Sequence, residues 1–283
     1  MAMTAYGDLC TQFYDLDKPQ APELALEWYS QRLQGAGRVL EPMCGSGRFL
    51  VPLVSRGLLV DGVDPSEPML RACRAKAASA RIAVVSPWGT WDPSSAEDWP
   101  DGNYPQPPRI RLWQQALEHL DLAGPAPVPA SPDAVPPARE AVEPYGAAFI
   151  PSSSFCLLDN AAAHQGLRRL RAHLAARALL LIEFEVPHGP DHWPGGNSRT
   201  VTAGSRQIRL VSRVEYNAGV QVETHYNQYE LKESGRVVQT ENEVLRLRSY
   251  APDEMRLLLA GAGFTEIEVE HPEFGWVVIA NAG

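Results

Sequence analysis

The chain has no long apolar run, and this absence limits where it can reside. None of its hydrophobic stretches is long enough to span a bilayer as a helix. The segment Met1–Asp8 has neither a basic stretch nor a hydrophobic run, so no signal peptide is expected. The four cysteines form no CxxC pair and have no metal-ligand spacing, which fits a reducing compartment. We therefore expect a cytoplasmic protein without a membrane partner.

Positive charge is also scarce. The sequence has 25 Lys and Arg residues against 34 Asp and Glu residues, and its formal net charge is -9 at pH 7. Binding to a nucleic-acid backbone needs a basic face, so no nucleic-acid partner is expected. The histidines are dispersed and form no metal-ligand cluster, which predicts a protein that works without a metal ion. The 283 residues are enough for one large α/β domain with an appendage.

A strand, a glycine turn, a helix and a second strand follow one another between residues 39 and 66. The first part reads V-L-E-P-M-C-G-S-G-R-F-L and the second V-D-G-V-D-P-S. Glycine has no Cβ, so a turn at Gly45 and Gly47 lets bare backbone approach a ligand. Asp64, at the tip of the second strand, is placed to accept hydrogen bonds from two ribose hydroxyls. This unit predicts a nucleoside-type cofactor at the C-terminal edge of a parallel sheet.

The turn lacks the third glycine of a dinucleotide site, where G-x-G-x-x-G opens a helix toward a pyrophosphate. Glu41, at the end of the first strand, would repel a pyrophosphate but attract an ammonium or a sulfonium. S-adenosylmethionine (SAM) carries both groups and has no phosphate. The run E-P-M-C-G-S-G-R resembles motif I of class I SAM-dependent methyltransferases, and Asp64 matches their ribose-binding acid. Three alternatives stay open: glycines that serve only packing, a nicotinamide-dependent oxidoreductase, and a SAM-binding protein without turnover.

The resemblance implies a Rossmann-like, mostly parallel seven-stranded sheet with helices on both faces, plus an inserted antiparallel β-meander. Residues 1–37 would form a helical lid, helical over 8–34, and residues 38–190 and 251–283 the cofactor-binding domain. The meander, within 191–250, follows from period-two alternation with turns at 217–219 and 233–236. It would cover the substrate side or contact a second copy in a homodimer. The Pro-rich segments 86–108 and 123–144 are expected to be loop insertions.

Two segments compete for the third strand of the sheet. We favour 110–113 over 81–85, because Leu120–Leu122 followed by the strand 147–150 resembles the passage from motif II to motif IV of these enzymes. The turn Gln115–Leu117 would then lie beside the adenine. Relatives usually have an acid in this turn, and Ala116 takes its place here, so the contact would come from the backbone or from Gln115.

The resemblance also assigns side chains to cofactor and acceptor. The cofactor would contact Tyr14, Glu41, Met43, Gly45, Gly47, Arg48, Asp64, Pro65, Met69, Gln115, Ala116, Leu117, Ile150, Pro151 and Ser152. The acceptor would contact Tyr14, Ser153, Ser154, Trp193, Tyr229 and Arg248. Each assignment has a structural alternative: Tyr14 could only pack the lid, and the serines could only cap the next helix.

Methyl transfer from a sulfonium is a direct displacement that requires alignment and exclusion of water. An amine acceptor needs little beyond positioning in its neutral form, whereas an alcohol or phenol needs a base. His188 and His192, after the fifth strand, and Glu183, near its tip, are the candidate catalytic residues, although a polar turn with exposed histidines is an equal alternative. The meander resembles that of small-molecule N-methyltransferases, which favours a nitrogen acceptor over oxygen or carbon.

Overall fold

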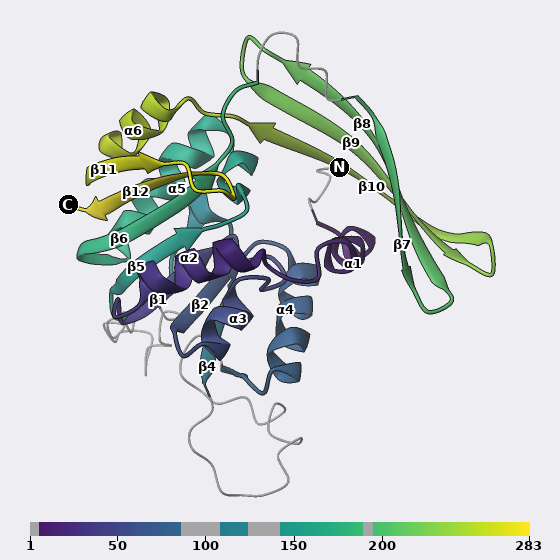
Figure 1. Cartoon of the computed structure of the whole chain (residues 1–283), viewed down its shortest axis with the longest axis horizontal. Helices are drawn as coiled ribbons and strands as arrows, with labels where there is room; N and C mark the ends of the chain where they lie inside the picture. Colours follow the sequence, from purple (N-terminus) through teal and green to yellow (C-terminus); the bar gives the residue numbers. More distant parts are fainter. Residues whose placement is uncertain (1–5, 86–107, 124–141, 189–194) are drawn as a thin grey trace, which may run out of the picture.

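The computed structural model describes residues 6–85, 108–123, 142–188 and 195–283, which form two sheets (Figure 1). The larger sheet has the order β11-β12-β6-β5-β1-β2-β4-β3. Its strands are β1 (Arg38–Pro42), β2 (Leu59–Asp64), β3 (Ala83–Val85), β4 (Arg109–Gln114), β5 (Tyr145–Ile150), β6 (Leu174–Phe184), β11 (Phe264–Glu270) and β12 (Trp276–Ala282). From β3 to β6 all neighbours are parallel, and β12 pairs antiparallel with both β6 and β11.

The mostly parallel sheet is confirmed, but it has eight strands where seven were expected. Both segments that competed for the third strand are strands. The favoured segment, β4, pairs with β2 from Gly62 opposite Leu112 to Asp64 opposite Gln114. The other segment, β3, pairs with the outer side of β4 and is only three residues long. The two segments therefore lie side by side instead of excluding each other.

Helices cover both faces of this sheet, because its central strands bury apolar side chains on both sides. One core contains residues of α2 (Glu23–Leu33), α3 (Leu50–Ser55) and α4 (Glu67–Ser79) packed against Val39 and Phe149. The other contains residues of α5 (Asn160–Ala172) and α6 (Pro252–Gly261) packed against Leu40 and Ile150. Neighbouring residues of one strand thus point into different cores.

No helix within the described ranges is long and apolar enough to cross a membrane.

The expected helix over 8–34 is divided into α1 (Asp8–Asp17) and α2. Pro19 and Pro22 follow the end of α1, and Pro22 is the residue that precedes the first turn of α2. Proline lacks the N–H that an inner helical turn needs, so the chain bends between the two helices. The helix α5 begins at Asn160, because the Asp159 side chain accepts a hydrogen bond from the Ala162 N–H and caps its start.

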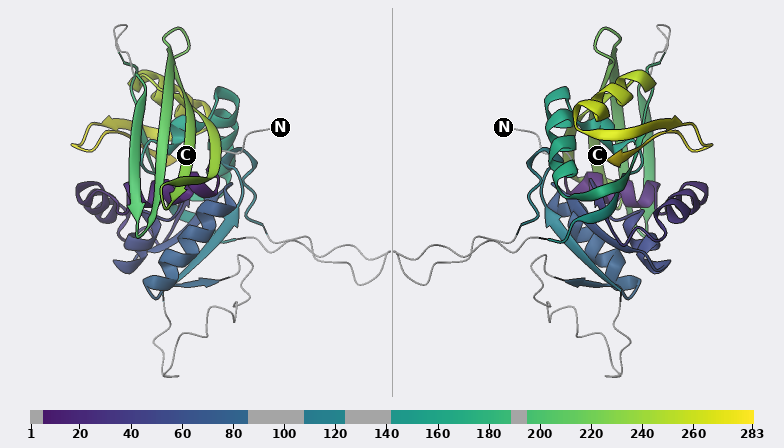
Figure 2. Two further views of the ribbon diagram at one scale, coloured as in Figure 1. Left: turned by 90° about the vertical axis from the view of Figure 1, so that its right-hand side faces the viewer. Right: turned by 90° about the vertical axis from the view of Figure 1, so that its left-hand side faces the viewer.

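The second sheet is the expected meander, with four antiparallel strands: β7 (Asn197–Ala203), β8 (Arg206–Asn217), β9 (Val222–Glu233) and β10 (Arg236–Arg248). Figures 1 and 2 show it as a curved wall beside the large sheet, with α1 against its inner side. Leu9, Cys10 and Phe13 of α1 form a small core with the inner-face residues Leu210 and Tyr229. The meander and α1 therefore enclose the C-terminal edge of the parallel strands.

Candidate functional site

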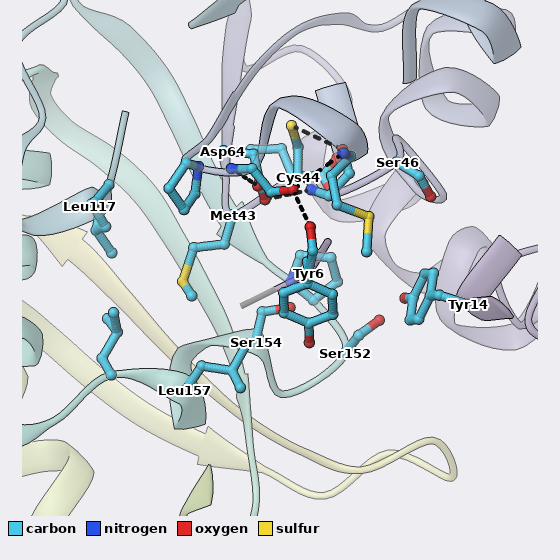
Figure 3. A pocket seen from close by; sticks show the side chains of 18 of the residues that line it. Tyr6, Tyr14, Met43, Cys44, Ser46, Asp64, Leu117, Ser152, Ser154 and Leu157 are labelled. Carbon is cyan, nitrogen blue, oxygen red and sulfur yellow. Dashed lines mark hydrogen bonds between the residues drawn. The ribbon is translucent and has the colours of Figure 1, made fainter. Parts of the chain in front are cut away.

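A pocket of about 590 Å³ lies at the carboxyl ends of β1, β2, β4 and β5. This volume falls within the range of about 300–1,000 Å³ that is typical of small-molecule sites. Met43 and Cys44 of the turn after β1 lie on one side of it, and Tyr14 of α1 lies on another (Figure 3). Leu245 of β10 lines it from the meander. The pocket thus brings together six separate parts of the chain.

The turn after β1 owes its shape to three residues with positive φ. Met43, Gly45 and Gly47 have φ of 59°, 53° and 74°. A Cβ on Gly47 would lie 2.6 Å from the Cys73 Sγ of α4, so this glycine allows α4 to pack closely. A Cβ on Gly45 would meet only the Met69 Sδ, at 3.8 Å, so its open side faces the pocket. The two glycines serve different purposes, packing and ligand access.

Asp64 lies at the tip of β2 and is held by the turn that it faces. Its Oδ2 accepts the N–H of Gly45 at 2.9 Å, and its Oδ1 accepts the N–H of Ser66 at 2.8 Å. Burial raises the pKa of this carboxyl to about 6, and the two N–H donors oppose that rise. A carboxylate has about four acceptor positions, so two remain for hydroxyl groups of a ligand. This fits a vicinal diol.

Glu41 is a buried carboxyl in the wall of the pocket, and its side chain is incompletely bonded. The residue is 2% exposed, and its Oε2 has no hydrogen-bond partner among the described residues. Burial raises its pKa, while the nearby Arg48 guanidinium lowers it. A buried polar atom without a partner is rare in folded proteins, since its desolvation is not offset. The site therefore fits a ligand that brings a cationic or N–H donor group to Glu41.

Arg48 supplies positive charge at the side of the pocket that faces α1. Its guanidinium donates to the Ser152 hydroxyl and lies 5.5 Å from the centroid of the Tyr14 ring. Its Nε is buried and has no hydrogen-bond partner within the described ranges. A guanidinium with a spare donor suits a carboxylate. Glu41, Asp64 and Arg48 together fit a ligand with an ammonium group, a diol and a carboxylate.

The N-terminal segment is fixed over this pocket by polar contacts to the glycine turn. The Asp15 Oδ1 of α1 accepts hydrogen bonds from the Ser46 hydroxyl at 2.5 Å and from the Lys76 Nζ at 2.6 Å. The Ser66 hydroxyl donates to the main-chain oxygen of Tyr6 at 2.7 Å. These contacts hold Tyr6 and Tyr14 at the mouth of the pocket.

A second cavity of about 330 Å³ adjoins the first, between α1, the loop after β5 and the inner face of the meander. The two cavities share six lining residues: Tyr6, Tyr14, Ser152, Ser154, Leu157 and Leu245. Charged and polar side chains line the second cavity more densely, among them Asp17, Lys18, Glu185, Arg199, His225 and Asn227. The pair is arranged like a cofactor chamber that opens into an acceptor chamber.

Most of the predicted site residues line one of these cavities. The first cavity is lined by Tyr14, Glu41, Met43, Gly45, Arg48, Asp64, Pro65, Met69, Ala116, Leu117, Pro151, Ser152 and Ser154. Ser153 and Tyr229 line the second. The Ser153 hydroxyl donates to Glu185, and the Tyr229 hydroxyl donates to the buried Glu243. His192 and Trp193 lie outside the described residues.

Six predicted residues line neither cavity: Gly47, Gln115, Ile150, Glu183, His188 and Arg248. The Gln115 amide is turned into its own loop, where it bonds the main chain of Asp121 through both Nε2 and Oε1. Ile150 is a core residue of β5. Arg248 pairs with Glu254 on α6.

The two candidate catalytic residues among these six are held by other groups. The Glu183 Oε2 accepts the N–H of Ser152 at 2.8 Å, beneath the loop that lines both cavities, and burial raises its pKa to about 7. The His188 Nε2 lies 3.8 Å from the Glu223 Oε1. Catalytic roles for Glu183 and His188 stay predictions, and the positions of these side chains favour support of the site over contact with a ligand.

Sequence reasoning missed several lining residues, including Tyr6, Leu157, Leu245 and His225. Tyr6 belongs to a segment with no motif, and the two leucines are ordinary apolar residues. The alternation of β9 predicts that His225 shares one face with Glu223 and Asn227, but it does not tell which face points into the cavity. Among the described residues, no group of three or more His, Cys, Asp or Glu could hold a metal ion.

No protein-family model matches this chain. A protein of Geobacillus sp. (strain WCH70), named as a methyltransferase, is 37% identical over 78 residues. That match covers 25% of this chain and 32% of the relative, so the chain spans about a third of the length of the curated relative it matches.

Solved structures match over nearly the whole length. The SAM-bound amino pentose methyltransferase CalS10 of Micromonospora echinaspora covers 100% of both chains at 16% identity, with a TM-score of 0.61. The sugar N-methyltransferase KedS8 of Streptoalloteichus sp ATCC 53650 covers 99% of this chain and 97% of its own at 18% identity, with a TM-score of 0.65. The methyltransferase CcbJ of Streptomyces caelestis covers 98% and 97% at 21% identity, with a TM-score of 0.64. The strand order and this likeness show that the chain has the fold of the class I SAM-dependent methyltransferases.

Proposed function

We propose that this chain transfers the methyl group of SAM to a nitrogen atom of a small-molecule acceptor. The observation that carries the proposal is the buried Glu41 carboxyl, whose Oε2 has no hydrogen-bond partner among the described residues, in one pocket with Asp64 and Arg48. SAM offers a matching group to each of the three. Its ammonium suits Glu41, its ribose diol suits Asp64, and its carboxylate suits Arg48.

The apolar part of the same pocket suits the adenine ring. Met43 and Leu117 line this part (Figure 3), together with Met69. Ala116 takes the place where relatives usually have an acid, so it offers only main-chain groups to the adenine amine. SAM supplies an activated methyl group on a sulfonium. The protein residues bind it, orient it toward the second cavity and keep water away from the junction.

The shared lining of the two cavities supports a direct displacement. A transfer in line with the breaking C–S bond needs the acceptor atom on the far side of the methyl carbon from the sulfur. Tyr14, Ser152 and Ser154 line both cavities, so a ligand in each would meet between them. Tyr6 and Tyr14 cover this junction from the lid side and would exclude bulk water during transfer.

The second cavity supports a polar acceptor of modest size that carries an amine. The Glu185 carboxylate lines it and accepts only the Ser153 hydroxyl among the described side chains, so acceptor positions remain for an N–H group. The amino pentose methyltransferase and the sugar N-methyltransferase that resemble this chain over 99% or more of its length also support a nitrogen acceptor, and amino sugars are the acceptor class to test first.

The cofactor half of the proposal is tested by calorimetric titration of the purified chain with SAM and with NAD. We expect SAM binding in the wild type, its loss in Asp64→Ala, and its retention in Asp253→Ala. Asp253 is a matched control because its side chain on α6 is 90% exposed. Binding of NAD, or SAM binding unaffected by Asp64→Ala, would contradict the proposal. A panel of free and nucleotide-linked aminodeoxyhexoses, with S-adenosylhomocysteine release as the readout, then tests the acceptor class.

A further inference from the structure

One histidine on the meander lies in the wall of the second cavity. His225 sits on β9 on the same face as Asn227 and Tyr229, both of which are buried. It pairs with Leu245 of β10, which lines both cavities. His225 is therefore one strand away from the junction where the two ligands of the proposed reaction would meet.

A carboxylate fixes the imidazole of this histidine. The His225 Nε2 lies 3.1 Å from the Glu223 Oε2, and the two side chains share one face of β9 because they are two residues apart. Their side chains are 24% and 17% exposed. When Nε2 carries the proton that faces Glu223, the other ring nitrogen, Nδ1, keeps a lone pair. A carboxylate behind an imidazole is the arrangement that orients a histidine as a base.

Apart from Glu185, whose carboxylate is assigned above to an N–H group of the acceptor, the other ionisable groups of this cavity are less suited to that role. Besides His225, the titratable residues that line it are Tyr6, Cys10, Tyr14, Asp17, Lys18, Glu185, Arg199 and Tyr229. Burial raises the pKa of the three tyrosines and the thiol, so all four keep their protons.

Most charged groups on the neighbouring elements are bonded to, or lie close to, other protein groups. Asp17 of α1 pairs with Arg199 of β7 at 2.7 Å. Glu243 of β10 accepts from the Tyr6 N–H and from Asn227 and Tyr229. His188 approaches Glu223 from outside the cavity. Lys18 is the competing base, because burial and the nearby Arg48 and Arg199 lower its pKa.

We propose that His225 is the general base of the transfer and that Glu223 is its positioning residue. This inference rests on the proposed function. In the step, the acceptor's N–H bond breaks and its proton moves to His225 Nδ1. The nitrogen lone pair forms the new N–C bond as the C–S bond of the sulfonium breaks and its electron pair stays on sulfur. The imidazolium formed is stabilised by Glu223 and returns its proton to solvent.

The first test needs no acceptor. The chain has seven histidines, so ¹⁵N-histidine NMR spectra of the full-length protein can be assigned with His225→Gln. We expect the Nε2–H tautomer of His225 in the wild type and loss of this preference in Glu223→Gln. An Nδ1–H tautomer in the wild type would overturn the inference, because the nitrogen away from Glu223 would then carry no lone pair.

The second test is kinetic and uses the aminodeoxyhexose panel. We expect His225→Gln to lower kcat by about 10²-fold or more near neutral pH, with recovery at higher pH as the free amine loses its own proton. Glu223→Gln should shift the acid limb of the kcat/KM profile, and Lys18→Met should leave it in place. Two results would overturn the inference: a pH profile of kcat/KM that is unchanged in His225→Gln, or an acid limb that disappears in Lys18→Met.

SAM titration separates this inference from the proposed function. If wild-type protein does not bind SAM, the proposed function fails. If SAM binds equally to wild type and to His225→Gln while the pH profiles coincide, only the role of His225 fails. A purely structural role for His225 would change thermal stability and would leave the acid limb unchanged.

Discussion

Glu241 on β10 accepts a hydrogen bond from the main-chain N–H of Cys10 on α1, at 3.0 Å. Its other oxygen accepts the N–H of Leu9, also at 3.0 Å. No side chain of α1 caps this end of the helix, so a strand 231 residues further along the chain satisfies two N–H groups of the first turn. A Cβ on Gly7 would lie 2.6 Å from the Glu241 carboxyl, so Gly7 leaves room for this contact.

This contact predicts that Glu241→Ala weakens the attachment of α1 to the meander. The free energy of unfolding should fall by about 1–2 kcal/mol, because two N–H groups lose their acceptor and the helix dipole loses a counter-charge. Chemical denaturation measures the change. Glu233→Ala is the control, since its side chain at the end of β9 is 49% exposed and pairs only with Arg206 among the described residues. An equal loss in both variants would contradict the capping role of Glu241.

A second prediction concerns Gly47 and Cys73. Gly47→Ala should lower the free energy of unfolding by about 3 kcal/mol, because a Cβ would meet the Cys73 Sγ at 2.6 Å in a backbone with φ of 74°. Cys73→Ala removes that sulfur, so the double variant should recover at least about 1 kcal/mol relative to additivity. Thermal or chemical denaturation of the four proteins measures the coupling. Additive effects would show that the strain lies in the backbone alone.

The third prediction is a pH dependence of SAM binding. Burial raises the pKa of Asp64 to about 6, and only its ionised form can accept from both ribose hydroxyls. Protonation as pH falls through this value should weaken binding, so Kd at pH 5 should be about tenfold higher than above pH 7. Calorimetry from pH 5 to pH 8 measures it.

Asp64→Asn should flatten this profile while weakening binding at every pH. Glu183→Gln is the control for the same pH range, because the pKa of Glu183 is raised to about 7 and its carboxylate bonds the Ser152 main chain outside the pocket. If the pH dependence of SAM binding is lost in Glu183→Gln instead, the titrating carboxyl is that of Glu183, and the prediction for Asp64 is wrong.

The local part of this architecture could be read from the sequence. Glu41, the glycine turn and Asp64 lie within one strand–turn–helix–strand unit, and short-range patterns determine its shape. The antiparallel meander was equally clear, because its alternation and turns are local signals. The edge strand β3 was not counted, because its segment was weighed only as the alternative to β4 and not as a strand beside it.

Contacts between residues far apart in the chain could not be predicted from these local patterns. The face of β9 that holds His225 could be predicted, but the position of that face against the second cavity depends on how the meander packs on α1. Gln115 was expected at the adenine, yet its amide bonds the main chain of Asp121, six residues away. From the sequence alone, the Gln115 amide could bond either the adenine or a nearby main-chain group. The conformation of the loop determines which of the two it bonds.

The last prediction separates stability from binding at Glu41. Glu41→Gln should raise the free energy of unfolding, because a buried carboxyl with an unpartnered Oε2 is replaced by a neutral amide of similar shape. The pKa of Glu41 is raised by burial, so the wild type loses stability as pH rises while the variant does not, and the gain should grow with pH. SAM affinity should fall about tenfold or more, since the ammonium of the cofactor loses its carboxylate. Thermal denaturation and calorimetry measure the two effects, with Glu268→Gln on β11 as the control. A variant that binds SAM as tightly as the wild type would show that Glu41 does not contact the cofactor.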